Sequence, residues 1–176
     1  MNHRKWFKMY LLSLTILYVS GCSTTSVQES TLVAKETPET ITFSVPASKV
    51  KITIPNTQLV KQNANPTNSY RYFNYSGKTS GFTISGWFEP ASLFKGLKYS
   101  WTQFLKEWSG STPENIEFSS VGSWEVVTYS IATGPCVQSS LRANVVKNGT
   151  WVELHLSSPC NKSMNLKEYL ERILVE

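Results

Sequence analysis

The sequence predicts an α+β domain, in which an antiparallel β-sheet carries two packed helices. Several stretches alternate apolar and polar residues with a period of two, and two stretches place apolar residues at helical spacing. These patterns are typical of half-buried strands and of amphipathic helices, respectively. The connections between the stretches are short, which favours antiparallel pairing of successive strands.

The first predicted strands cover residues 41–45 and 50–54, and each is followed by a proline. The polar stretch 56–68 predicts an exposed loop. Strands at 70–75 and 81–88 then predict a hairpin.

After Pro90 the spacing of apolar residues changes to three and four, which predicts a helix over 92–108. Strands follow at 116–118 and 124–131. A second helix is predicted at 165–175, where Asn165 and Glu168 have the spacing of a capping box.

The sharpest local prediction is a hairpin formed by 137–147 and 150–157, because Asn148-Gly149 favours a two-residue turn between them. That turn fixes the register, which places three apolar pairs on one face. These pairs are Val145 with Val152, Ala143 with Leu154, and Leu141 with Leu156. The order of elements over 41–176 resembles the PsbP-like fold, which also occurs in small proteins that bind other proteins. The resemblance concerns topology and implies no particular function.

The N-terminus predicts export. A basic start and an apolar stretch at 9–19 are typical of a secretory signal over 1–21, and the stretch is shorter than the roughly 20 residues that span a bilayer. Val19-Ser20-Gly21-Cys22 resembles the lipobox of bacterial lipoproteins. The resemblance implies cleavage before Cys22, a diacylglycerol on its sulfur, and an acyl chain such as palmitate on its new amine.

The anchor implies a place in the cell envelope, attached to the membrane through the lipid on Cys22. Ser23 follows this cysteine, which implies the outer membrane, facing the periplasm, in a host with two membranes. Residues 22–40 are rich in Ser, Thr and Glu and lack aromatic residues, so we expect a flexible tether. A single domain is expected over 41–176.

The net charge argues against nucleic acid as a partner. The whole chain has 17 basic and 12 acidic residues, a formal charge of +5, but three of the basic residues lie in the signal. The mature chain is therefore left with +2, and most of the basicity belongs to targeting.

Two cysteines remain in the mature chain, and an exported protein with an even pair is expected to join them. A Cys136–Cys160 disulfide would close the open end of the predicted 137–157 hairpin. A loop of this length gives a stabilisation of roughly 3 kcal/mol.

The sequence offers few catalytic groups, so we expect no enzyme, no metal site and no cofactor. It contains no aspartate, and His155 is the one histidine outside the signal. In the predicted register His155 lies opposite Arg142 and beside Glu153, which favours a surface cluster of charges. A cell-wall or glycan hydrolase that uses Glu153 and His155 remains an alternative.

Aromatic residues crowd both faces of the 70–88 hairpin, so one face is either exposed for binding or covered like the other. An exposed patch of Tyr70, Tyr72, Tyr75 and Trp87 would suit a protein or glycan partner, because rings contribute contact area at little entropic cost. We expect a non-enzymatic envelope lipoprotein that binds another envelope protein. A small-ligand carrier, with a pocket between sheet and helix, is a further alternative.

Overall fold

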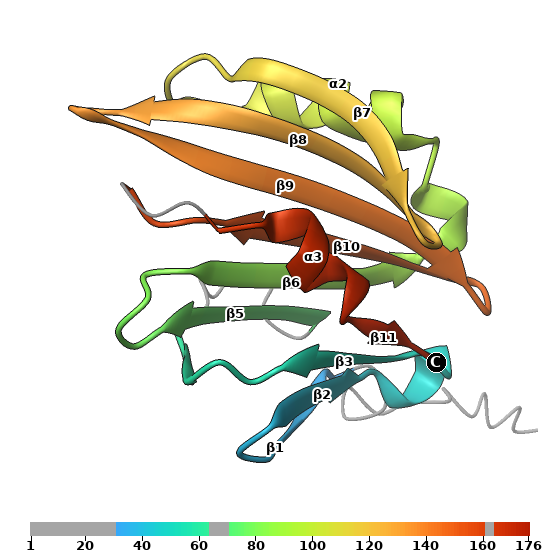
Figure 1. Cartoon of the computed structure of the whole chain (residues 1–176). Coiled ribbons are helices and arrows are strands. Elements are labelled where there is room, and N and C mark those ends of the chain that lie inside the picture. The colour runs from blue at the N-terminus through green and yellow to red at the C-terminus, as the bar shows by residue number, and fades with distance from the viewer. Residues whose placement is uncertain (1–30, 64–70, 161–163) are drawn as a thin grey trace, which may run out of the picture.

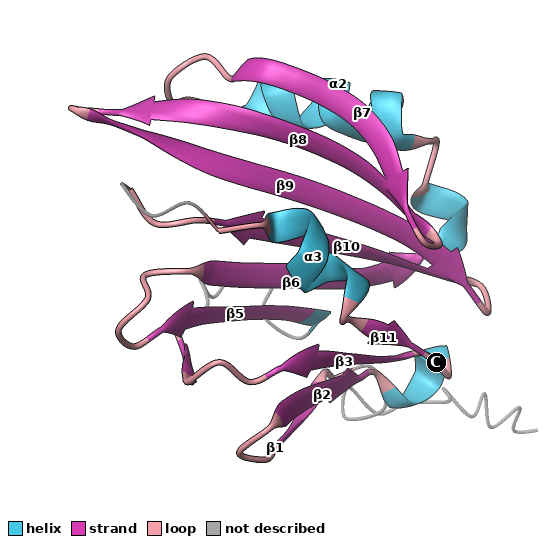
Figure 2. Cartoon of the chain, in the orientation of Figure 1, coloured by secondary structure: helices cyan, strands magenta, loops and turns pink. Residues whose placement is uncertain are grey.

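The computed structural model describes residues 31–63, 71–160 and 164–176, which form an α+β fold of antiparallel sheets with two short helices (Figure 1, Figure 2). A seven-stranded sheet has the order β4-β5-β6-β10-β9-β8-β7, and a four-stranded sheet has the order β1-β2-β3-β11. The strands are β1 (Val33–Glu36), β2 (Thr40–Ser44), β3 (Lys51–Pro55), β4 (Leu59–Lys61), β5 (Tyr72–Gly77), β6 (Thr83–Pro90), β7 (Glu114–Val121), β8 (Trp124–Thr133), β9 (Cys136–Lys147), β10 (Thr150–Ser157) and β11 (Leu174–Val175). The predicted class is confirmed, although a second sheet was not predicted.

One face of the seven-stranded sheet packs against the small sheet and helix α3 (Leu166–Glu171). Alternation along β10 directs Val152, Leu154 and Leu156 into this layer, where each is fully buried. Phe43 of β2 stacks on Phe73 of β5 with ring centroids 3.8 Å apart. This layer is the main core, because most of the buried apolar side chains belong to it.

Helix α2 (Leu97–Glu107) lies on the opposite face of the seven-stranded sheet, behind β8 in the view of Figure 1. Its Trp101 is buried against Val127, Tyr129 and Ile131 of β8, which form a second, smaller cluster. The helix therefore covers one side of that face, and the outward residues of β6 and β10 lie beside it.

The predicted Asn-Gly hairpin is confirmed. Asn148 and Gly149 both have positive φ, at 49° and 76°, as the tight turn requires. The register of β9 and β10 pairs the apolar residues as predicted, with Val152 opposite Val145 and Leu154 opposite Ala143. The hairpin of β5 and β6 also forms, with Tyr72 opposite Trp87.

Both predicted helices are shorter than expected. The helix predicted over 92–108 is interrupted at Gly96, whose φ of 98° is incompatible with a continuous helix, so Ala91–Leu93 forms a separate 3₁₀ turn. The helix predicted over 165–175 ends at Glu171, and Leu174–Val175 instead pairs with β3 as β11. The N-cap is confirmed, because the Asn165 side chain accepts a hydrogen bond from Glu168 N at 3.1 Å.

Two stretches predicted to lack regular structure contain strands. Residues 33–36, within the predicted tether 22–40, form β1 and pair with β2. Leu59–Lys61, within the predicted loop 56–68, forms β4 and pairs with β5. Both predictions are wrong over these residues, because backbone pairing with neighbouring strands outweighs a polar local composition.

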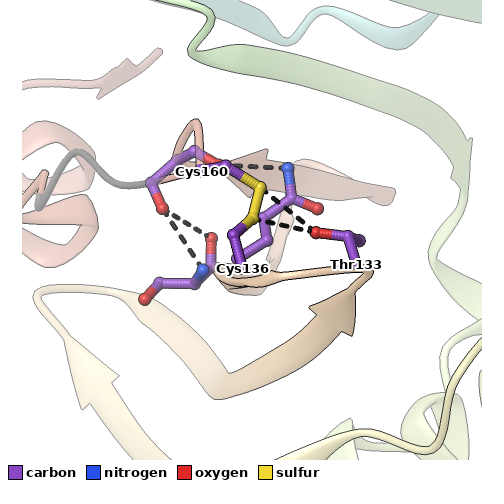
Figure 3. Close-up of a disulfide and its surroundings, with 6 residues drawn as sticks. Thr133, Cys136 and Cys160 are labelled. Carbon is purple, nitrogen blue, oxygen red and sulfur yellow. Dashed lines mark hydrogen bonds between the residues drawn. A yellow bond between two sulfur atoms is a disulfide. The ribbon is translucent and has the colours of Figure 1, made fainter.

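The Cys136–Cys160 disulfide is present, with Cα atoms 5.7 Å apart (Figure 3). Thr133 Oγ1 lies 3.2 Å from each sulfur. The β10 ladder ends at Ser157, so the chain leaves the register before Cys160 and reaches its partner. In the described part of the chain, no helix is long and apolar enough to cross a membrane.

Candidate functional site

A hollow on the described surface lies between α2 and the uncovered part of the seven-stranded sheet. We call it the α2 groove, and its volume is about 930 Å³. It is lined by Trp87, Glu89, Leu93, Tyr99, Ser100, Gln103, Phe104, Glu107, Trp108, Arg142, Trp151, Glu153 and His155. The strand residues form its floor, and the helix residues form one wall, because α2 sits over β8.

Each tryptophan of the groove is held by a neighbour. Trp151 donates its indole N–H to Asn144 Oδ1 at 2.8 Å, and Trp108 donates its own to the Ser111 carbonyl at 2.8 Å. The Trp87 ring packs on Tyr72, with centroids 4.7 Å apart. The rings are therefore pre-positioned, which lowers the entropic cost of binding.

An ion pair forms the centre of the floor. Glu153 Oε1 accepts hydrogen bonds from Arg142 Nη2 and, at 2.8 Å, from Nε. Both side chains are mostly buried, with exposed fractions of 13% for Arg142 and 12% for Glu153. The Arg142 guanidinium also lies 4.2 Å from the centroid of the Phe104 ring, a cation–π contact that joins floor to wall.

His155 extends this polar cluster. Its Nε2 lies 2.9 Å from the Tyr129 hydroxyl and 3.4 Å from Ser157 Oγ. Burial, helped by the nearby Arg142 charge, lowers the pKa of His155 from 6.5 to about 3. Burial raises the pKa of Tyr129 to about 12.

The two pKa shifts fix the protonation of this contact. At neutral pH the imidazole is uncharged and the phenol keeps its proton. Because the phenol keeps its proton, it can donate to His155 Nε2 in the tautomer that carries the imidazole proton on Nδ1.

The structure brings part of the predicted aromatic patch together. Tyr72 and Trp87, two residues of that patch, contact each other on the groove side of the sheet. The prediction of an exposed patch is wrong for Tyr75, which is 1% exposed and lies in the main core. Its hydroxyl donates a hydrogen bond to Glu36 Oε1 at 2.7 Å. Tyr70, like Cys22, lies outside the described residues.

Glu153 and His155 both line the α2 groove, as the hydrolase alternative required. Within the described residues the two side chains share no hydrogen bond, since Glu153 binds Arg142 and His155 binds Tyr129. A histidine with a pKa near 3 is a poor general base at neutral pH.

Sequence reasoning missed Trp151 and the helix side of the groove. Trp151 shares its strand face with Glu153 and His155 by simple alternation, so a signal for it existed. Tyr99, Gln103 and Glu107 became groove residues only through the placement of α2, which the sequence does not specify. Among the described residues, no group of three or more His, Cys, Asp or Glu side chains could hold a metal ion.

Comparison with known proteins adds little. No protein-family model matches the chain, and no curated protein sequence matches it. A crystal structure of a protein from Bacteroides thetaiotaomicron VPI-5482 is similar, with 15% sequence identity and a TM-score of 0.44. The match covers 72% of this chain and 45% of that one, so the chain spans less than half of its length. At this level the similarity assigns neither a fold family nor a function.

Proposed function

We propose that this protein is a lipid-anchored envelope lipoprotein whose domain binds a partner molecule non-covalently in the α2 groove. The observation that carries the proposal is the groove itself, where three tryptophans with fixed rings surround a mostly buried Arg142–Glu153 pair. Aromatic and arginine side chains of this kind dominate the energetics of binding surfaces.

A binding role fits the chemistry of the floor better than catalysis does. The Glu153 carboxylate is engaged by Arg142, and the low pKa of His155 keeps its ring neutral. The imidazole is therefore held in its neutral state and the carboxylate is held in place by Arg142, as suits a fixed pattern of hydrogen bonds.

The lipid anchor and the cellular location are further parts of the proposal, and the sequence supports them. The lipobox-like Val19-Ser20-Gly21-Cys22 supports lipidation at Cys22, and Ser23 supports the outer membrane facing the periplasm. The described fold begins at residue 31 and reaches β1 at Val33, so residues 23–30 stand between anchor and domain. A PsbP-like topology remains a proposal for this fold.

Site-specific photocrosslinking in cells tests partner binding. A photoreactive residue at Gln103, within the groove, is expected to give a discrete crosslinked product. The same residue at Val137, which is 61% exposed and away from the groove lining, is the matched control. Trp87→Ala should abolish the Gln103 product and leave cellular protein levels unchanged. Identical products from both positions, or a Gln103 product that survives Trp87→Ala, would contradict the proposal.

A hydrolase acting on cell-wall or glycan material is the second candidate, favoured by the presence of Glu153 and His155 in one groove. It predicts turnover that is lost in both Glu153→Gln and His155→Ala variants. Release of reducing ends from purified cell wall measures that turnover. Equal release by the wild type and both variants would remove this candidate.

A further inference from the structure

We propose that the molecule bound in the α2 groove is an uncharged oligosaccharide, which deepens the proposed function by naming the ligand class and rests on it. The groove combines aromatic ring faces with planar polar groups of both hydrogen-bonding types, and its charges nearly cancel. The ring faces come from the tryptophans, whereas Arg142 and Glu153 contribute to both the hydrogen-bonding groups and the charge balance.

Two of the three tryptophans present ring faces rather than hydrogen-bond donors. The indole N–H groups of Trp151 and Trp108 are consumed by Asn144 and Ser111, so these side chains contribute to binding through their ring surfaces. Trp151 is also fixed from the other side by Phe94, whose centroid is 5.4 Å away. A flat apolar surface that is locked in place suits the C–H face of a sugar ring, which needs stacking and little rearrangement.

The floor offers both an acceptor and a donor for hydroxyl groups. Both hydrogen bonds from Arg142 end on Oε1 of Glu153, and within the described chain no hydrogen bond to Oε2 is found. Gln103, on the helix wall, adds an amide with both a donor and an acceptor. A hydroxyl group can donate to a carboxylate and accept from a guanidinium or amide, so a polyhydroxylated ligand satisfies both kinds of partner.

The charge balance selects against ionic ligands. Arg142 neutralises Glu153, and Arg71 Nη1 lies 3.9 Å from Glu89 Oε2. His155 is neutral because its pKa is about 3. Of the charged side chains that line the groove, Glu107 alone has no ion-pair partner within the described chain. Among the described residues, an anionic ligand therefore meets no free positive charge, and Glu107 is the one uncompensated charge that a cationic ligand would meet.

The size of the groove fits more than one sugar ring. Its volume of about 930 Å³ lies near the upper end of the roughly 300–1,000 Å³ of small-molecule sites. The tryptophans come from three different elements, β6, α2's C-terminal end and β10, so ring faces are distributed along the groove.

Saturation-transfer NMR and tryptophan fluorescence titrations on the full lipidated chain in nanodiscs test the proposal. The probes are chitohexaose and cellohexaose as neutral glycans, an oligogalacturonate as an acidic glycan, and a Lys-Tyr hexapeptide as a cationic peptide. We expect saturable binding of a neutral glycan, and no binding of the oligogalacturonate or of the Lys-Tyr hexapeptide.

Three variants locate the binding. Trp87→Ala should weaken the neutral glycan by about tenfold, which corresponds to about 1.4 kcal/mol. Phe118→Ala is the matched aromatic control, since Phe118 is 40% exposed on β7 and lies outside the α2 groove; it should change the affinity by less than about twofold. Glu107→Gln tests for a cationic ligand, whose binding would depend on the Glu107 charge.

Preferential binding of the cationic peptide, with loss of that binding in Glu107→Gln, would overturn the proposal. So would the failure of both neutral glycans to bind a folded wild-type protein. If the Trp87-dependent crosslink at Gln103 is nevertheless present in cells, partner binding stands and the ligand class alone is wrong. Loss of both results would refute the binding function as well.

Discussion

Protonation of His155 is expected to destabilise the folded domain, and this can be measured against a variant that cannot be protonated. In the native state the ring is part-buried, contacts Tyr129 through Nε2, and has a pKa of about 3, against 6.5 for an exposed histidine. The unfolded chain therefore binds more protons than the folded one between these two values. The free energy of unfolding falls as the pH is lowered from about 6.5 toward 3.

The size of the effect follows from the two pKa values. At about pH 5 the unfolded histidine is almost fully protonated and the native one almost fully neutral, which costs the native state about 2 kcal/mol relative to pH 7. His155→Gln keeps a side-chain acceptor for the Tyr129 hydroxyl but has no titrating group. The variant should therefore lose about 2 kcal/mol less stability than the wild type over the same pH interval.

Urea unfolding of both proteins at pH 7 and pH 5, with the disulfide intact, measures the difference. All other side chains are the same in the two proteins, so their contributions cancel in the comparison. The imidazole carbon shifts in NMR should also stay constant between these pH values. Parallel pH dependences of the two unfolding free energies, or a histidine that titrates near pH 6.5, would refute the reasoning.

Three further predictions concern stability. Gly86→Ala should destabilise the domain by about 1–3 kcal/mol, because an added Cβ would lie 2.7 Å from the Phe73 ring and 2.8 Å from Leu154 Cδ2. An unchanged midpoint of urea unfolding would contradict this close packing. Trp101→Ala should lower the free energy of unfolding by about 3–5 kcal/mol and reduce the near-ultraviolet circular dichroism signal of the cluster under α2. Trp101→Phe should lower it less, and equal losses of stability in the two variants would contradict the packing role of Trp101. Cys160→Ala should cost roughly 3 kcal/mol, and reductant should lower wild-type stability by a similar amount while leaving the variant unaffected.

The elements that the sequence predicts well are stabilised by their own residues. The β9–β10 hairpin is marked by Asn148-Gly149 and by a matching apolar pattern, so its register follows from local information alone. β11 is the opposite case. Leu174 and Val175 continue a helical pattern, yet they form a strand because β3 offers an edge far away in the sequence. β1 and β4 are short strands of four and three residues within largely polar stretches, and they exist through pairing in the same way.

The residues of the candidate site likewise fall into those that local sequence predicts and those that depend on distant packing. Alternation places Trp87, Glu153 and His155 outward on neighbouring strands, and the structure brings all three into the groove. Tyr72 and Tyr75 differ by an odd number of positions, so a strand sends them to opposite faces, and grouping them in one patch was wrong. The depth of the groove depends on where α2 rests, and α2 begins directly after its N-cap Gly96, whose positive φ separates the helix from the preceding 3₁₀ turn.

The pairing of β3 with β11 has a consequence for how the chain folds. β7, β8, β9 and β10 are joined by tight turns, so their ladders close small loops and can form early. The four-stranded sheet joins Thr53 to Leu174 and has a far larger closure entropy to overcome. During synthesis β3 emerges long before its partner, and its edge stays open to other chains until then. Folding is therefore expected to start in the middle of the sequence and to end with its two ends meeting.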